Sequence, residues 1–409
     1  MSDNLKAYNI FDLRDIALKR VPKGFFEFVD RGTEDEIALR NNRAVFDRIR
    51  FRTRTFVDVS KRTQETTIFG TKYKMPLVIA PTGVAGLLWH EGEIKLAKAA
   101  RAAGIPFTLA TGSITAMERV ADEAGGDLWF QLYLWPDRSM SHELVNRAKA
   151  AGYKTLVVTV DGVSSGNREY NLRNGFTLPF SFNARNMWDM ATHPRWLMGV
   201  MARYLMTTGM PMYANYPEAA KAKMTKGPPG RASLRTDSIE WDDLDALRKI
   251  WPGKLIDKGI LDPQDALTAV DHGADGIDVS NHGGRNLDGI VSPIEVLPEI
   301  VDAVGKRTTI FMDSGIRRGS DVVKALALGA NAVMVGRSTL YGVAAGGEAG
   351  AARALAIYRD EIHRNMALLG CNTIEEIGPQ CLLFADKHEL RAPKERPALR
   401  VVDAKAAES

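Results

Sequence analysis

Residues 308–337 of the chain read TTIFMDSGIRRGSDVVKALALGANAVMVGR. The first part, Thr308–Gly315, and the last, Ala332–Arg337, are short runs of apolar and β-branched residues, which are typical of buried strands. Between them, Gly319–Gly329 has the spacing of an amphipathic helix and closes on glycine, a common residue at helix C-termini. The order strand, helix, strand predicts a parallel βαβ unit.

The same alternation runs through most of the chain. Helix-period stretches lie between most of the strand-like runs, for example Glu93–Ala103, Ser141–Ala151 and Pro263–Gly273. Eight strands that alternate with helices predict an α/β fold, the (β/α)8 TIM barrel. A doubly wound sheet also alternates in this way, but a polar or glycyl residue at each strand's C-terminal end favours closure. The six earlier strand-like runs are Pro76–Pro81, Phe107–Thr111, Asp127–Tyr133, Thr155–Asp161, Lys254–Gly259 and Gly276–Asn281.

The length of 409 residues by itself indicates two or three domains. The strand count instead predicts one domain over 1–385, with the barrel at 76–350 and a helical lead-in before it that includes Phe11–Arg20. The gap after the fourth strand is several times longer than any other and indicates an insertion at 178–237. The polar tail 386–409 is interpreted as an arm or as disorder.

The composition excludes several classes of protein. With 45% hydrophobic and 25% charged residues the chain is neither disordered nor fibrous. Its only cysteines, Cys371 and Cys381, lack metal-ligand spacing, so we expect no disulfide framework, no metal site and a reducing compartment. A formal charge of +4 is too small to indicate nucleic acid. Without a signal-like or membrane-spanning apolar run, we expect a cytoplasmic protein.

Chemically distinctive side chains stand where the predicted strands end, at the face that carries the active sites of barrels. Arg168 and Arg285 could clamp a carboxylate. His282 could accept a proton, with Asp161 to hold the imidazole and favour its charged form. Lys258 adds a fixed cation that would stabilise negative charge on a bound electron carrier.

The last two strands end in glycine and arginine. Gly315 with Arg317, and Gly336 with Arg337, match the usual phosphate site of barrels, in which backbone N–H groups and guanidinium bind a dianion. A phosphate site, a base, a carboxylate clamp and a cation together predict a cofactor enzyme that acts on an acid.

These residues also carry a family resemblance. The chain, from about Pro22 to Cys371, resembles the FMN-dependent 2-hydroxy-acid oxidases and dehydrogenases, without the middle of the insertion and the tail. The motifs that carry it are Ser280–Arg285 (SNHGGR), Asp313–Gly319 (DSGIRRG) and Ala325–Ala330 (ALALGA). Resemblance to the members that oxidise mandelate is carried by Ala80–Gly83 (APTG), Asp127–Tyr133 (DLWFQLY) and Gly336–Gly342 (GRSTLYG).

The resemblance implies a reaction and its residues. A 2-hydroxy acid, aryl or bulky like mandelate, would be oxidised to the 2-oxo acid. His282 would remove a proton from the substrate, with Asp161 as its electrostatic partner. Arg168 and Arg285 would bind the carboxylate, and Tyr133 would contact the substrate hydroxyl or the developing charge.

The resemblance also implies the cofactor, FMN, and its contacts. Lys258 would lie beside the pyrimidine ring, where the reduced flavin's negative charge collects, and Asp313 would bind the ribityl chain. Gly83 resembles the dehydrogenases, so we expect electrons to pass to a quinone or another carrier, and relatives are commonly tetramers. The flavin would be held by Thr82, Gly83, Thr111, Gln131, Thr159, Lys258 and Ser280, and its phosphate by Gly315, Arg317, Gly336 and Arg337.

Two positions depart from the family pattern. The family usually supplies a second phenol to the substrate carboxylate after the first helix, but this chain has Phe28 and Val29 there. The missing phenol leaves open an enzyme of this fold that oxidises an amine or a modified peptide. A flavin-binding protein without turnover is a further alternative, against which His282, Arg168 and Arg285 argue. Asp278 also lies inside the sixth strand, where an apolar residue is ordinary, and nothing in the sequence accounts for it.

The insertion is rich in basic residues and in methionine. Residues 178–237 hold eight basic and three acidic residues, a local excess of +5, and eight of the 15 methionines. Between Arg195 and Met206 the apolar positions follow a helical stripe. An apolar face with a basic flank suits a membrane interface, so we expect peripheral attachment to the inner face of a membrane; a core or a lid over the barrel mouth is the alternative.

Overall fold

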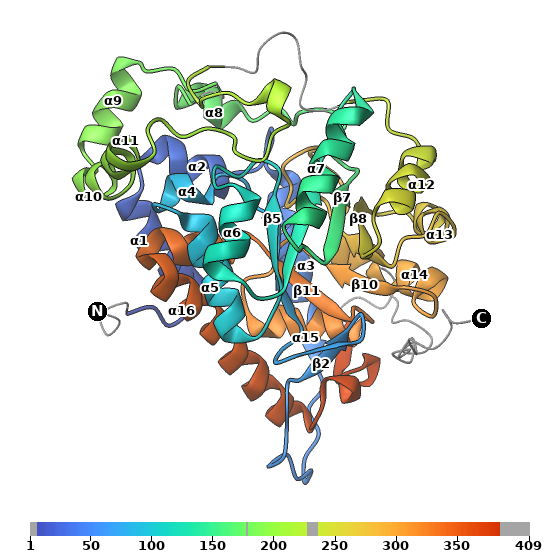
Figure 1. Ribbon diagram of the computed structural model, residues 1–409. Coiled ribbons are helices and arrows are strands. Elements are labelled where there is room, and N and C mark those ends of the chain that lie inside the picture. Colours follow the sequence, from blue (N-terminus) through green and yellow to red (C-terminus); the bar gives the residue numbers. More distant parts are fainter. Residues whose placement is uncertain (1–5, 177–178, 227–235, 385–409) are drawn as a thin grey trace.

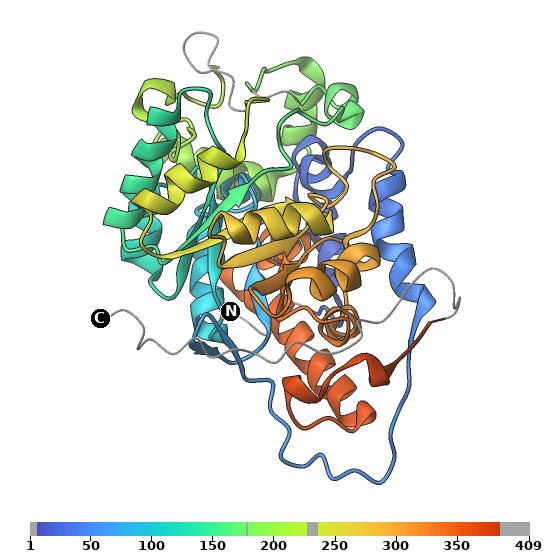
Figure 2. The same cartoon turned by 90° about the vertical axis from the view of Figure 1, so that its right-hand side faces the viewer.

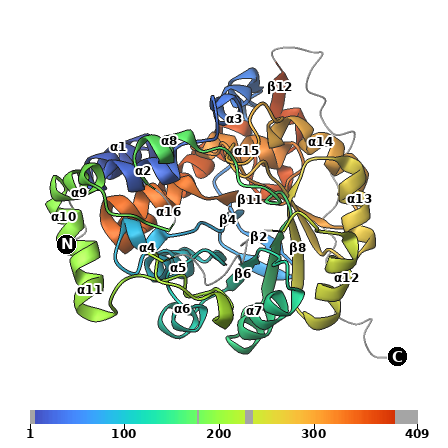
Figure 3. The same cartoon turned by 90° about the horizontal axis from the view of Figure 1, so that it is seen from above.

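The computed structural model describes residues 6–176, 179–226 and 236–384. Eight parallel strands close into a barrel in sequence order, and β11 pairs back onto β4 (Figure 3). This confirms the predicted TIM barrel, and every predicted strand is present. The strands are β4 Leu77–Ile79, β5 Phe107–Ala110, β6 Leu128–Leu132, β7 Thr155–Thr159, β8 Lys254–Ile260, β9 Gly276–Val279, β10 Thr309–Met312 and β11 Ala332–Val335.

Helices surround this barrel (Figures 1 and 3). The predicted helices agree with the structure to within a few residues at their ends. The stretch Arg337–Leu369 consists of two helical segments that meet at a kink at Gly346 and Gly347, whose backbone is not helical. The barrel helices are α5 Gly92–Ala103, α6 Met117–Ala124, α7 Arg138–Ala150, α12 Trp241–Ile250, α13 Pro263–Asp271, α14 Pro293–Val304, α15 Gly319–Ala327 and α16 Arg337–Leu369, with the short α4 Ala85–Leu88.

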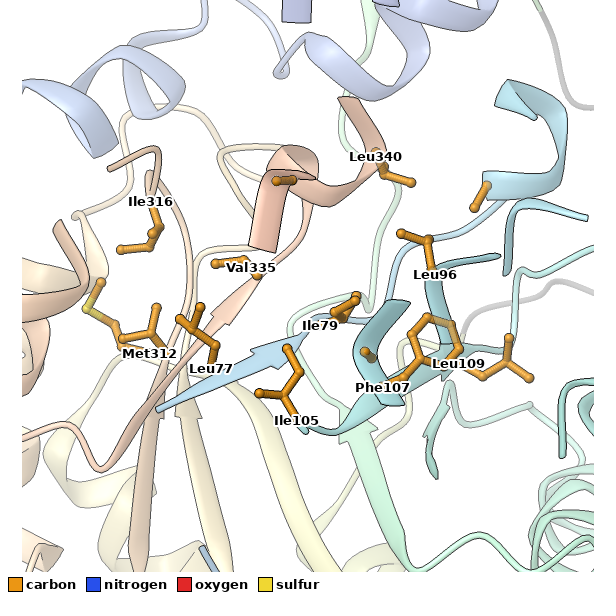
Figure 4. Close-up of a cluster of buried hydrophobic side chains, with 14 of the residues drawn as sticks. Leu77, Ile79, Leu96, Ile105, Phe107, Leu109, Met312, Ile316, Val335 and Leu340 are labelled. Carbon is orange, nitrogen blue, oxygen red and sulfur yellow. The ribbon is translucent and has the colours of Figure 1, made fainter. Parts of the chain in front are cut away.

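Alternation along each strand produces two apolar layers. Outward side chains such as Leu77, Ile79 and Leu109 pack against the helices (Figure 4). Inward side chains fill the barrel, among them Trp129 and Phe311, whose rings meet edge to face at 5.7 Å. The interior is therefore a packed floor, and only its C-terminal end is open to chemistry.

A small hairpin adds to this floor from below. Strands β2 (Thr66–Ile68) and β3 (Thr71–Tyr73) are antiparallel, and Phe69 at their turn packs on Trp129 and Phe311. Sequence reasoning did not predict this hairpin, because its strands are very short and partly polar.

The lead-in and the end of the described chain meet at one side of the barrel. Helices α1 (Ile10–Arg20), α2 (Lys23–Asp30) and α3 (Ile37–Arg48) are followed by β1 (Ile49–Phe51). Strand β1 pairs antiparallel with β12 (Leu382–Phe384), which joins the two ends of the domain (Figure 2). Two short 3-10 turns, Ile374–Glu376 and Pro379–Cys381, precede β12. The predicted tail 386–409 lies outside the described residues.

The insertion forms a separate group of helices above one side of the barrel (Figure 1). Within the expected stripe Val200, Met201 and Tyr204 are buried, so much of that apolar face is covered by the barrel rather than free to meet a lipid surface. In the part of the chain that is described, no helix is long and apolar enough to span a membrane. The elements are α8 Glu169–Arg173, α9 Ala184–Ala191, α10 Pro194–Trp196, the π-helical turn Leu197–Ala202, α11 Arg203–Thr207 and the 3-10 turn Glu218–Ala220.

Candidate active site

A cavity of about 330 Å³ opens at the C-terminal ends of the barrel strands. This volume lies in the range of roughly 300–1,000 Å³ that is typical of cofactor and small-molecule sites. All of the predicted site residues line it except Asp161 and Ser280, which lie directly behind lining residues. The barrel thus brings together side chains that are spread over more than half of the sequence.

His282 lies between two polar partners. Its Nδ1 is 2.8 Å from Oδ1 of Asp161, and its Nε2 is 3.3 Å from the hydroxyl of Tyr133. Burial lowers the pKa of His282 below its ordinary value, against the opposing influence of Asp161. The imidazole is therefore neutral at neutral pH, as a proton acceptor must be, and Asp161 is placed to stabilise the charged form. No helix begins at Asp161, so it does not act as a helix cap.

The backbone at His282 is strained. His282 has φ of +57°, a left-handed conformation that is uncommon for a residue with a side chain. Gly283 and Gly284 continue in this conformation, and a Cβ on Gly284 would lie 2.7 Å from the backbone nitrogen of Leu39 in α3. The two glycines of the SNHGGR motif therefore allow a tight loop that packs against the lead-in and directs His282 into the cavity.

Both predicted clamp arginines line the same cavity. Arg168 Nε donates to the backbone carbonyl of Arg285 at 3.3 Å, and Arg285 Nη1 donates to the carbonyl of Arg31 at 2.9 Å. The guanidinium of Arg285 also lies 5.5 Å from the ring centre of Phe28. Neighbouring backbone and an aromatic ring thus hold the arginines in place, which favours bidentate binding of a carboxylate.

Phe28 lines the cavity where the family usually provides a phenol. It packs against Phe176, with ring centres 5.1 Å apart. The structure therefore offers an apolar, aromatic wall beside Arg285 and no hydroxyl from this residue.

One end of the cavity has the donors expected for a flavin ring. Gln131 lines it, and its buried Nε2 has no hydrogen-bond partner among the described residues. Its Oε1 accepts from the backbone N–H of Thr111 at 3.2 Å, and Thr111 Oγ1 donates to the Gln131 carbonyl at 2.6 Å. A buried amide donor without a protein partner is available to an acceptor on a ligand or a water, and a flavin pyrimidine carbonyl would be such an acceptor.

The opposite end is suited to phosphate. Gly315 has φ of +80°, and a Cβ there would lie 2.0 Å from the carbonyl oxygen of Asn42 in α3, so only glycine fits. Gly336 is the N-cap of α16, whose N-terminus is directed at the same region and favours an anion. The cavity residues thus fit FMN at both ends.

Arg337 connects the phosphate end of the cavity to the helical lead-in through hydrogen bonds. Its guanidinium donates to the carbonyls of Val29, Gly283 and Arg31, at 2.9, 2.9 and 3.1 Å, and burial lowers its pKa. Three of its five N–H groups are therefore used within the protein, which leaves two for a phosphate. Arg317 also lines the cavity and donates to the carbonyl of Ile316.

Part of the cavity wall comes from residues that the sequence analysis did not name, although it gave a lid over the barrel mouth as an alternative for the insertion. The insertion contributes Pro179, Tyr213, Tyr216 and Lys226, and Trp135 follows β6. Tyr213 and Tyr216 stack with ring centres 4.4 Å apart. The aromatic pair in the sequence YANY was a weak signal, because nothing local shows that a loop folds back over the barrel mouth.

Comparison with known proteins decides the family. The family model for FMN-dependent dehydrogenases matches residues 17–383. The chain belongs to this FMN-dependent dehydrogenase family. It is 42% identical over 382 residues to (S)-mandelate dehydrogenase of Pseudomonas putida, which covers 93% of this chain and 95% of that protein. It is also 42% identical to L-lactate dehydrogenase of Pectobacterium atrosepticum, over 93% and 97% of the two chains.

Solved structures give the same result. The crystal structure of the monotopic membrane protein (S)-mandelate dehydrogenase matches with a TM-score of 0.87 at 41% identity, over 93% of this chain and all of that chain. A mandelate oxidase with (S)-2-phenylpropionate matches with a TM-score of 0.76 at 35% identity, over 92% and 98%. The protein is thus an FMN-dependent enzyme of the 2-hydroxy-acid dehydrogenase family, as the sequence motifs predicted.

Proposed function

We propose that this enzyme oxidises a bulky or aryl 2-hydroxy acid, with (S)-mandelate as the reference substrate, to the 2-oxo acid. The observation that carries the proposal is that His282, paired with Asp161 behind it, faces the same cavity as Arg168 and Arg285. Mandelate and lactate dehydrogenases are both similar to the chain. The apolar wall at Phe28 and the aromatic pair Tyr213 and Tyr216 favour an aryl acid over lactate.

In this proposal each group has one task. Arg168 and Arg285 bind the substrate carboxylate and fix its orientation. His282 Nε2 accepts a proton from the substrate, and Asp161 stabilises the resulting imidazolium through Nδ1. The hydroxyl of Tyr133, 3.3 Å from Nε2, contacts the substrate oxygen on the same side.

FMN supplies the acceptor for the two electrons that leave the substrate. Gln131 and Thr111 would hold its pyrimidine end, together with Thr82, Gly83 and Thr159 along the ring. Lys258, backed by Ser280, would lie beside the pyrimidine ring, and Asp313 would bind the ribityl chain. The backbone at Gly315 and Gly336, with the remaining donors of Arg317 and Arg337, would bind the phosphate.

For the acceptor we propose a quinone or another carrier, reached at the inner face of a membrane. A monotopic relative and the exposed apolar residues of the insertion support peripheral attachment. We further propose that residues 1–385 act as one domain and that the enzyme assembles as a tetramer.

The test uses the purified full-length protein without oxygen. We expect it to carry the yellow colour of flavin and to bleach when (S)-mandelate is added, more readily than with L-lactate. His282→Ala should keep the colour and lose the bleaching, because the cofactor contacts are intact and the base is gone. A flavin that neither acid bleaches, and that an amine or a peptide reduces instead, would contradict the proposal, and so would the absence of flavin.

A further inference from the structure

Lys258 is the centre of a buried polar cluster beneath the cavity, formed with Asp278, Ser280 and Asp313 and called here the Lys258 cluster. Strands β8 and β9 place Lys258 directly beside Asp278 in the register of the sheet. Lys258 lines the cavity, whereas Asp278 does not line it and is fully buried. Because neighbouring strands in register direct paired side chains to the same face, Asp278 lies in the barrel floor under Lys258.

The ammonium group of Lys258 has no donor left over. It lies 2.6 Å from Oδ2 of Asp278 and 2.8 Å from Oγ of Ser280, and it also contacts Oδ2 of Asp313. Three acceptors match the three hydrogens of an ammonium group. The positive charge is therefore fixed in position. How strongly it attracts negative charge on a ligand depends on whether the two carboxyls are ionised.

The charges in the cluster do not balance when both carboxyls are ionised. Two carboxylates and one ammonium leave a net charge of −1 in a buried site, which is costly unless a proton is taken up. Asp313 is the better placed to stay ionised, because Oγ of Ser314 donates to its Oδ1 at 2.8 Å. Oδ1 of Asp278 is buried without a hydrogen-bond partner among the described residues, so it is the position where a proton fits.

The electrostatics agree with this assignment. Burial, helped by the charges of Asp313 at the end of β10 and Asp161 after β7, raises the pKa of Asp278 to about 7 against the opposing charge of Lys258 on β8. For Asp313, burial is outweighed by Lys258, and the pKa is lowered. Asp278 is thus the member of the cluster that can change its charge near neutral pH.

We propose that Asp278 is a positioning residue that acts through Lys258: it takes up one proton when the bound flavin is reduced and thereby sets the reduction potential of the flavin. This inference rests on the proposed place of Lys258 beside the flavin pyrimidine ring. Negative charge that arrives above Lys258 makes ionised Asp278 less favourable, and by linkage a protonated Asp278 makes reduction easier.

The balance of the reduction is two electrons and two protons. Two electrons and one proton enter the flavin, which becomes a reduced anion, and the second proton enters the carboxylate of Asp278. Oxidation of a 2-hydroxy acid to the 2-oxo acid releases the same two electrons and two protons. The half-reaction then adds no net charge to the buried site, whereas reduction beside a lysine without Asp278 would add one negative charge.

The experiment measures the midpoint potential of the flavin in the holoenzyme between about pH 6 and pH 9, with mediator dyes and no substrate. Each proton taken up with two electrons changes the equilibrium constant tenfold per pH unit, which is about 30 mV. Above neutral pH, we expect the midpoint potential of the wild type to change by about 60 mV per pH unit, which corresponds to two protons. The slope of Asp278→Asn should be about 30 mV per pH unit, which corresponds to one proton. Above neutral pH, the equilibrium constant for reduction of the flavin in the Asp278→Asn variant should also be at least tenfold larger than in the wild type.

Asp257→Asn is the matched control, because Asp257 is a similarly buried carboxyl on β8 whose oxygens make no hydrogen bond to Lys258 or to any other described residue. It should keep the wild-type slope. Asp278→Val repeats the test with an apolar strand residue. A wild-type slope of one proton, or equal slopes and potentials in wild type and Asp278→Asn, would overturn the inference. Reduction by (S)-mandelate is measured in a separate experiment. The potentials can therefore be interpreted even if (S)-mandelate is not the substrate.

Discussion

His282 shows how a single residue is tuned by its surroundings. Burial lowers its pKa below the ordinary value of about 6.5. Only the neutral imidazole accepts a proton, so kcat/KM should be constant above that value and fall as the pH drops through the lowered pKa. A pH–rate profile with (S)-mandelate measures this limb, and a loss of activity that begins well above pH 7 would contradict it.

Asp161→Asn separates the two influences on His282. Asp161 is the group that raises the pKa of His282 against burial, so the variant should shift the acidic limb to still lower pH. It should also reduce kcat by roughly 10²-fold, because the imidazolium loses its partner 2.8 Å away. The same profile measures both effects, and an acidic limb and a kcat that both stay unchanged in Asp161→Asn would contradict this role of Asp161.

Phe28→Tyr tests the apolar wall of the clamp. A phenol beside Arg285 would add a hydrogen bond to the bound carboxylate, which is worth about 1.5–3 kcal/mol. We expect KM for (S)-mandelate to fall by about tenfold or more, with kcat little changed. Phe28→Leu, which removes the ring under Arg285, should raise KM instead. An unchanged KM in both variants would mean that Phe28 does not contact the substrate.

Among the elements, the turn after β10 is tightly constrained by its packing against α3. Gly315→Ala would place a methyl group against the Asn42 carbonyl and push α3 away from the phosphate end. We expect loss of bound FMN and a lower Tm, measured by absorbance and thermal unfolding. Gly70→Ala is the control, because Gly70 has a similar φ of +79° but open space, so it should cost only about 1–2 kcal/mol. Equal effects of the two variants would rule out the steric explanation.

The insertion helices have two apolar faces. Val200 and Tyr204 face the barrel, whereas Met198 and Met206 are 63% and 74% exposed. If the outer face meets the membrane, Met198→Glu with Met206→Glu should reduce sedimentation with anionic lipid vesicles several-fold and leave FMN content unchanged. Leu368→Glu, on the exposed side of α16, is the control. Equal vesicle binding by all three proteins would contradict peripheral attachment through these helices.

At the scale of the whole molecule, Asp257 weakens the fold. Its carboxyl is buried, neither oxygen has a hydrogen-bond partner in the described part of the chain, and burial raises its pKa to about 8. The folded protein therefore keeps a proton that the unfolded chain loses above about pH 4. Stability should fall as the pH rises from about 4 to about 8 and then stay level. Asp257→Asn should remove this decline and gain on the order of a few kcal/mol at pH 8, measured by urea unfolding at several pH values.

Much of the barrel and most of the cavity could be predicted from the sequence. Strand and helix periods depend on residues a few positions apart, and in a parallel barrel every strand's C-terminal end lies at the same face. Hence the pattern predicted that His282, Arg285 and Lys258 would meet. The His282 loop is also local, since SNHGGR contains its own glycines for the left-handed turn.

The tertiary structure alone decided the remainder. The β1–β12 pairing, the burial of Val200 and Tyr204 and the contribution of Tyr213 to the cavity join segments that are distant in sequence, and no local pattern encodes such contacts. Asp278 is the clearest case. In the sequence it is a misplaced charge within an apolar strand, and only the register of β9 beside β8 shows that it lies under Lys258, where its charge has a partner.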